Sequence, residues 1–222
     1  MKLIEYTDRE AMAMDVANVL AGALKNCLFQ HEWASFAVPG GSTPGPIFDA
    51  LCAADLDWAR VRVTLTDERW VSEGSDRSNG ALLRQRLLVN RAAAAQFVPL
   101  YVPGAAIEEG AAQVSSELAD AVPLSVLLLG MGADMHTASL FPGAAGVAEA
   151  MAPGAPLVCP VWPGDQEPRV SLSAETLRGA LSTHVVITGD DKRRALDQAQ
   201  RLAPDAAPIA AVLRDSSIHW AP

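Results

Sequence analysis

Residues 124–143, LSVLLLGMGADMHTASLFPG, join the most apolar segment of the chain to a glycine-flanked turn. The apolar run shows no alternation of apolar and polar side chains, which is typical of a strand that helices cover on both faces. Gly130 and Gly132 then allow the chain to turn sharply before His136. We therefore expect a buried strand of a parallel sheet, followed by a loop at the carboxyl end of that strand.

Short apolar runs and amphipathic segments alternate along the rest of the chain in the same way, which is the pattern of a mainly parallel α/β sheet. The first helix is expected over residues 8–30, with Thr7 and Glu10 as its capping box. The other expected helices are 44–54, 78–89, 107–121, 173–179 and 191–202, and the expected strands are 33–38, 61–66, 97–101, 124–130, 158–162, 169–172 and 184–188. Residues 142–164, rich in proline and glycine, are interpreted as a long irregular excursion.

Composition and charge limit the kind of partner that the protein can bind. Half of the 222 residues are hydrophobic and 19% are charged, which is ordinary for one large or two small globular domains. The net charge of −9 argues against nucleic acid as a partner, because binding a phosphate backbone needs a basic face. An anionic substrate would therefore need cations supplied locally by its site.

The remaining sequence features concern location and metals. No window approaches about 20 uninterrupted apolar residues and the first residues do not resemble a signal peptide, so we expect no membrane contact and a cytoplasmic location. Cys27, Cys52 and Cys159 are widely spaced and odd in number, which predicts buried thiols rather than disulfides or a metal motif. No metal site is expected.

Two polar motifs follow expected strands, where ligands bind in open parallel sheets. In VPGGSTPG (38–45), Gly40 and Gly41 allow close approach of the backbone, Ser42 and Thr43 offer hydroxyls, and the following helix start favours an anion. The motif is typical of a phosphate cradle, although a capped turn without ligand is the alternative and the Walker spacing is absent.

The second motif, TLTDERWV (64–71) with SDRSN (75–79), brings Asp67, Glu68, Arg69 and Arg77 together. Such a cluster orients sugar hydroxyls or a catalytic group, or else is a solvated loop with weak surface ion pairs.

The turn after residue 130 matches neither of two familiar motifs. Met135 stands where a dinucleotide fingerprint needs its third glycine, and neither Ser42 nor Ser139 lies in a G-x-S-x-G elbow. His136 remains as a candidate general base, with Asp134 two residues earlier and an expected helix start behind it. The other histidines, His31, His184 and His219, have no metal-ligand spacing and are expected to be structural.

Two cations lie at strand boundaries in PRVSLSAETL (168–177) and VVITGDDK (185–192). Arg169 begins an expected strand, and Lys192 falls in the first turn of an expected helix. A lysine there opposes the helix dipole, which favours a bound anion nearby, although an exposed lysine is the alternative.

Taken together, the motifs resemble the 6-phosphogluconolactonase family and, more distantly, the glucosamine-6-phosphate deaminases. The resemblance covers nearly the whole chain in order and rests on GGSTP (40–44), TDER (66–69), SN (78–79), GMGADMHTASLFPG (130–143), RVSLS (169–173) and TGDDK (188–192).

This resemblance implies a Rossmann-like three-layer α/β sandwich with a mainly parallel central sheet, formed by one domain over residues 1–222. It also implies hydrolysis of 6-phospho-D-glucono-1,5-lactone, a sugar-phosphate lactone, without cofactor or metal, by a monomer or weak homodimer. His136 is then similar to the family's general base, and Asp134 is a candidate for orienting its imidazole. Gly40, Gly41, Ser42, Thr43 and Lys192 look like the phosphate site, while Asp67, Arg69, Arg77 and Arg169 are candidates for holding the phosphate, the hydroxyls or the oxyanion.

Two alternatives remain. An amino-sugar phosphate deaminase resembles this chain as far as the histidine but then carries an acidic residue, whereas no acid follows His136 until Glu149. A non-catalytic sugar-phosphate sensor would need a DNA-binding module, for which no segment is spare. The family usually has glycine in place of Met135, so the φ angle at this residue decides whether His136 keeps the family's orientation.

Overall fold

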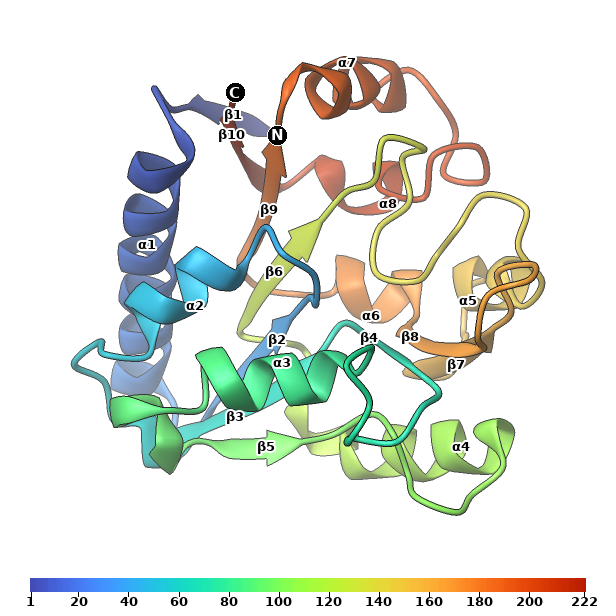
Figure 1. Ribbon diagram of the computed structural model, residues 1–222, viewed down its shortest axis with the longest axis horizontal. Coiled ribbons are helices and arrows are strands. Elements are labelled where there is room, and N and C mark those ends of the chain that lie inside the picture. The colour runs from blue at the N-terminus through green and yellow to red at the C-terminus, as the bar shows by residue number, and fades with distance from the viewer.

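The computed structural model describes all residues from 1 to 222 and contains a seven-stranded sheet in which every neighbouring pair of strands is parallel (Figure 1). Its order is β1-β10-β9-β6-β2-β3-β5. The bounds are β1 (Lys2–Glu5), β2 (Ala34–Val38), β3 (Val61–Leu65), β5 (Gln96–Val98), β6 (Val126–Gly130), β9 (Thr183–Thr188) and β10 (Ser216–Ala221).

Eight helices connect these strands. They are α1 (Arg9–Gln30), α2 (Gly45–Leu51), α3 (Asn79–Arg86), α4 (Ile107–Glu117), α5 (Val147–Met151), α6 (Ala174–Arg178), α7 (Asp190–Ala199) and α8 (Ala210–Leu213). Short 3₁₀ turns lie at Trp58–Arg60, Asn90–Ala94 and Ala119–Ala121.

The order of the strands reverses in the middle of the sheet, and this reversal produces the layers. From β1 the chain moves outward through β2 and β3 to β5, and it then returns through β6 and β9 to β10. Because parallel crossovers are right-handed, the outward connections α1, α2 and α3 lie on one face and the returning α7 and α8 on the other. The expected three-layer α/β sandwich with a mainly parallel central sheet is confirmed.

A second, smaller sheet packs against α4. It contains β4 (Asp67–Arg69), β8 (Arg169–Leu172) and β7 (Val158–Val161), and both of its strand pairs are antiparallel. One cluster of 55 buried apolar residues runs through both sheets, so they share a single core. Within β6, residues 126–129 are at most 1% exposed, as the apolar run predicts.

Several sequence-based expectations need correction. Asp8, not Thr7, caps α1, because the Asp8 carboxylate accepts a hydrogen bond from the Ala11 backbone N–H at 2.8 Å. The excursion at residues 142–164 is not irregular throughout, since it contains α5 and β7. The elements β1, β4, β10, α5 and α8 were not expected from the sequence.

No helix has the length and apolar character that a membrane span requires. All three cysteines are free thiols, and Cys52 and Cys159 are buried as predicted, whereas Cys27 is half-buried.

Candidate active site

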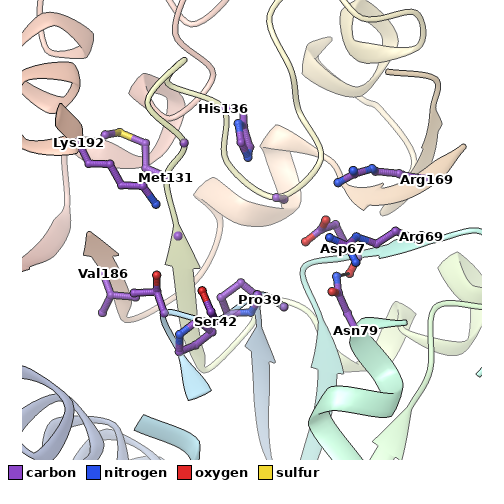
Figure 2. Close-up of a pocket in the computed structure, with 17 residues that line it drawn as sticks. Pro39, Ser42, Asp67, Arg69, Asn79, Met131, His136, Arg169, Val186 and Lys192 are labelled. Atoms are coloured by element: carbon purple, nitrogen blue, oxygen red, sulfur yellow. Dashed lines mark hydrogen bonds between the residues drawn. The ribbon is translucent and has the colours of Figure 1, made fainter. Parts of the chain in front are cut away.

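A cavity of about 260 Å³ opens at the carboxyl ends of the parallel strands (Figure 2). It lies where the strand order reverses, between neighbouring strands β2 and β6, whose following segments leave toward opposite faces of the sheet. Open α/β sheets bind ligands at this switch point. The lining residues are Pro39, Gly40, Gly41, Ser42, Thr43, Pro44, Asp67, Arg69, Asn79, Gly130, Met131, Gly132, His136, Ala138, Arg169, Val186 and Lys192.

The loop after β2 forms one wall and is built from glycines for two reasons. Gly41 has a φ of +92°, in the left-handed region that side chains rarely adopt. At Gly40 a Cβ atom would overlap the Asn79 side chain. The backbone N–H groups of residues 40–43 donate to no acceptor within the chain. Successive free N–H groups of this kind form a concave site for an anion.

Lys192 faces this loop across the cavity (Figure 2). It lies in the first turn of α7, as predicted, and is half-buried. Burial lowers the pKa of its ammonium group, and the nearby Asp134 carboxylate partly opposes that shift. The ammonium group forms no hydrogen bond or ion pair within the chain, so it is free to bind a ligand anion.

His136 lies on the loop that follows β6, and its side chain lines the cavity. Its Nδ1 lies 2.5 Å from Asp134 Oδ1, so the expected pairing of these two side chains is present. An ionised carboxylate only accepts, which places the ring proton on Nδ1 and leaves the lone pair on Nε2. Nε2 has no partner in the chain. Gly132 permits this arrangement, because a Cβ there would overlap both side chains.

Met135 adopts a left-handed conformation, with a φ of +67°. The turn therefore requires a positive φ at this residue, where the family usually has glycine. Methionine adopts this conformation at a cost of about 1–2 kcal/mol. Its backbone is fixed on both sides, since its N–H donates to the Gly132 carbonyl at 3.0 Å and its carbonyl accepts from Ile209 at 3.2 Å. The helix start expected directly behind His136 is absent, because residues 137–146 contain no helix.

The β4 strand forms another wall of the cavity, and its residues Asp67 and Glu68 have different roles. Asp67 is 6% exposed, lines the cavity and accepts a hydrogen bond of 2.6 Å from Ser139 Oγ. Glu68 instead points away from the cavity and accepts hydrogen bonds from the backbone N–H groups of Asn79 and Gly80. Burial raises the Glu68 pKa, against the opposing effect of these N–H groups. Glu68 is thus a buried cap for α3 rather than a member of the site.

Arg69 and Arg169 lie directly opposite each other in the antiparallel pair of β4 and β8. Like charges in that position are unfavourable. Burial lowers the pKa of Arg169, and the neighbouring Arg69 lowers it further. The Nε atoms of both arginines are buried without a partner. Two adjacent guanidinium groups that line one cavity are features of a site that an anion completes.

Arg77, predicted as a substrate ligand, does not reach the cavity. Its guanidinium pairs with Glu167, with Nη2 2.6 Å from Oε1, while its backbone carbonyl accepts a hydrogen bond from Arg69 Nη1. Arg77 therefore contacts the Arg69 guanidinium group through its backbone and does not line the cavity itself.

Asn79 lines the cavity but was not among the expected ligands, although it belongs to the SN motif. Its Nδ2 donates to the Asp67 carbonyl at 2.9 Å, and its side chain fills the space beside Gly40. Asn79 thus joins the two walls. In the sequence, the only indication that Asn79 lies at the site was its position in a helix-capping motif that follows an acidic cluster. No group of three or more His, Cys, Asp or Glu residues is arranged to hold a metal ion.

Comparisons with known proteins agree with this geometry. Residues 7–220 match the family model described as glucosamine-6-phosphate isomerases/6-phosphogluconolactonase. A protein of Rhizobium meliloti named 6-phosphogluconolactonase is 41% identical, over 96% of this chain and 94% of its own length. Its namesake in Pseudomonas aeruginosa is 39% identical, over 95% and 90%.

Among solved structures, a 6-phosphogluconolactonase from Shewanella baltica superposes with a TM-score of 0.95 at 31% identity, covering 100% of this chain and 98% of that one. The chain therefore belongs to the glucosamine-6-phosphate isomerase/6-phosphogluconolactonase family.

Proposed function

We propose that this protein hydrolyses 6-phospho-D-glucono-1,5-lactone to 6-phosphogluconate. The observation that carries the proposal is the position of His136, whose unpartnered Nε2 faces a cavity with unused anion donors on its walls. Relatives that bear the name 6-phosphogluconolactonase, at 37–41% identity over at least 95% of the chain, support it.

In the proposed reaction His136 is the general base. Nε2 takes a proton from a water molecule as the water oxygen attacks the lactone carbonyl carbon. The ring C–O bond then breaks, and the proton passes to the departing ring oxygen, which becomes the hydroxyl of the open-chain acid. Asp134 holds the Nδ1–H and stabilises the imidazolium between these steps. A positioned base contributes roughly 10²- to 10⁴-fold, which is sufficient for a lactone that already hydrolyses slowly in water.

The phosphate is proposed to lie against the N–H groups of residues 40–43 and the Lys192 ammonium group, because these donors have no partner within the chain. Asp67 is a candidate acceptor for a sugar hydroxyl. Arg69 and Arg169 are candidates for the developing oxyanion or for a further contact with the phosphate, since both line the cavity.

The deaminase alternative is less well supported. The first acidic residue after His136 is Glu149, which lies exposed on α5 and does not line the cavity. The site therefore offers no second acid beyond Asp134 in the segment where a deaminase is expected to have one.

The test is a hydrolysis assay with freshly prepared 6-phosphogluconolactone, in which proton release by the protein is compared with the spontaneous rate. Acceleration that persists after dialysis against a chelator supports the proposal. A rate equal to the blank contradicts it.

Four further expectations remain proposals. One domain over residues 1–222 is supported by the core that both sheets share. A cytoplasmic location is supported by the three free thiols, which suit a reducing compartment. A monomer or weak homodimer is expected, and nucleic acid is not an expected partner because the net charge is −9.

A further inference from the structure

Phe141 lies outside the cavity but touches two of the residues that line it. Its ring centroid is 4.3 Å from that of His136, with 37° between the ring planes. The guanidinium carbon of Arg169 lies over the same ring, 5.0 Å from its centroid. The candidate base and a buried site cation therefore share one aromatic neighbour.

His136 depends on this contact for the orientation of its ring. Its only side-chain hydrogen bond is from Nδ1 to Asp134, which is itself exposed. One hydrogen bond at one edge fixes the direction of the ring but leaves its plane free to tilt. The face of Phe141 limits that tilt and so helps to determine where Nε2 points.

Arg169 is held in a similar way. The only hydrogen bond of its guanidinium group within the chain runs from Nη2 to Gln166 Oε1 at 2.6 Å, and Gln166 is an exposed residue. Arg69 lies opposite and repels it. A cation over an aromatic face is attracted by the ring quadrupole, so Phe141 offsets part of that repulsion and holds the guanidinium group in place. In Figure 2, Arg169 extends toward the space below His136.

The backbone that carries Phe141 is fixed without help from its ring. Thr137 Oγ1 donates to the Gly130 carbonyl at 2.9 Å, and Ser139 Oγ donates to Asp67 at 2.6 Å. The Ser139 N–H also donates to Ser171 Oγ at 3.2 Å. Removal of the Phe141 ring is therefore expected to leave the loop folded.

We propose that Phe141 is a positioning residue, which sets the plane of the His136 imidazole and the place of the Arg169 guanidinium group through one ring. This inference rests on the proposed lactone hydrolysis. It assigns Phe141 two separable effects, one on turnover through His136 and one on substrate binding through Arg169.

The test compares Phe141→Leu with Phe141→Tyr. The leucine variant removes the aromatic face, and we expect kcat to fall about 10- to 100-fold, because small displacements of a catalytic group have effects of this size. KM is expected to rise roughly threefold or more through Arg169. The tyrosine variant keeps the face and is expected to stay within about threefold of wild type in both parameters.

Phe97 provides a matched control, because Arg84 lies over its ring at 4.8 Å and neither residue lines the cavity. Phe97→Leu loses the same kind of contact and is expected to leave kcat and KM within about twofold of wild type, the usual range for changes remote from the site. A loss of activity equal to that of Phe141→Leu would show that general destabilisation is the cause.

A second readout separates the two effects. In a His136→Ala background, Phe141→Leu is expected to cause no further fall in kcat while the rise in KM persists, because residues that act as a unit are not additive. If the leucine variant does not fold, Phe141→Met takes its place, since it keeps apolar bulk without a ring. Wild-type parameters in a folded ring-less variant overturn the inference, whereas a wild-type protein that does not accelerate lactone hydrolysis overturns the proposed function instead.

Discussion

Two regions of the molecule contain histidines in opposite situations. At the carboxyl end of β6, His136 uses one ring nitrogen and presents the other to a cavity. On the neighbouring strands β9 and β10, His184 and His219 are 6% and 0% exposed and lie 3.1 Å apart, from His184 Nδ1 to His219 Nε2. One of these histidines, His136, therefore lies at an accessible cavity, whereas His184 and His219 are buried in the fold.

The buried pair belongs to a continuous chain of hydrogen bonds. Tyr6 Oη donates to Asp15 at 2.6 Å and lies 2.8 Å from His219 Nδ1, which must then be the donor to Tyr6. His219 Nε2 is left as the acceptor for His184, and Ser182 Oγ lies 3.0 Å from His184 Nε2. All four ring nitrogens therefore have partners when both histidines are neutral.

The difference lies in which nitrogens are free. A histidine whose two nitrogens are both hydrogen-bonded inside the protein has no lone pair for a substrate, whereas His136 keeps one. We therefore expect changes at His136 to act on turnover and changes at the buried pair to act on stability.

The largest expected effect tests the first half of this comparison. His136→Ala removes the free nitrogen and should lower kcat for the phosphorylated lactone by roughly 10²- to 10⁴-fold. The free energy of unfolding should change by less than about 1 kcal/mol, because the only side-chain hydrogen bond of His136 goes to the exposed Asp134 carboxylate. Steady-state kinetics and urea unfolding measure the two quantities. Near wild-type turnover would remove the base assignment.

His219→Ala tests the second half. It leaves a cavity in the core and deprives both Tyr6 and His184 of a hydrogen bond, so the free energy of unfolding should fall by about 3–5 kcal/mol. The folded fraction should retain wild-type kcat. A variant of unchanged stability but reduced kcat would show that the buried chain serves the reaction.

The pH dependence of stability sharpens the same contrast. Burial, with smaller contributions from His184 and Lys2 and against the pull of Asp15, lowers the pKa of His219 from 6.5 to about 4. The folded state therefore binds the proton less tightly than the unfolded state, so this stabilisation is complete above pH 6.5 and is lost as pH falls through 4. The loss is at most about 3 kcal/mol. Urea unfolding at pH 7 and pH 4.5 should show a steeper decline for wild type than for His219→Ala; parallel declines would contradict this assignment.

Lys192→Ala tests whether the accessible region binds the phosphate. Loss of a charge-assisted contact should raise KM for the phosphorylated lactone roughly 10- to 100-fold. KM for unphosphorylated gluconolactone should change less than about threefold, because that substrate lacks the anion. Equal effects on both substrates would place Lys192 outside the phosphate site.

The smallest expected effect concerns Met135. Its φ of +67° shows that the turn already has the left-handed conformation, so Met135→Gly should leave kcat within about threefold of wild type. Relief of strain and the added flexibility of glycine oppose each other, and the free energy of unfolding should change by about 1 kcal/mol or less. A large gain in kcat would mean that methionine displaces His136.

The sequence was informative wherever a residue's environment is decided by its neighbours in the chain. The apolar run before His136 identified β6, and the glycines at residues 40 and 41 identified a turn that lines the cavity. The sequence did not predict β10, because a strand that contains a buried histidine does not form an apolar run. Only the Tyr6 and His184 contacts explain how His219 is accommodated.

Long-range pairing decides which polar residues of the motifs line the cavity. Arg69, Arg77 and Arg169 are alike as sequence, yet the register of β4 on β8 sets Arg69 opposite Arg169. The Arg77 guanidinium group pairs with Glu167, which is 90 residues distant along the chain, and does not line the cavity. Glu68 became a helix cap because its carboxylate meets the N–H groups of Asn79 and Gly80. Such contacts have no local signal.

The most direct test of the central claim is a side-by-side assay of wild-type protein with three substrates: 6-phosphogluconolactone, unphosphorylated gluconolactone and glucosamine 6-phosphate. The structure predicts that kcat/KM for the phosphorylated lactone exceeds that for the plain lactone by about tenfold or more, because only the former engages the anion donors. It also predicts no release of ammonia from glucosamine 6-phosphate. Ammonia release without acceleration of lactone hydrolysis would contradict the assignment of this cavity as a lactonase site.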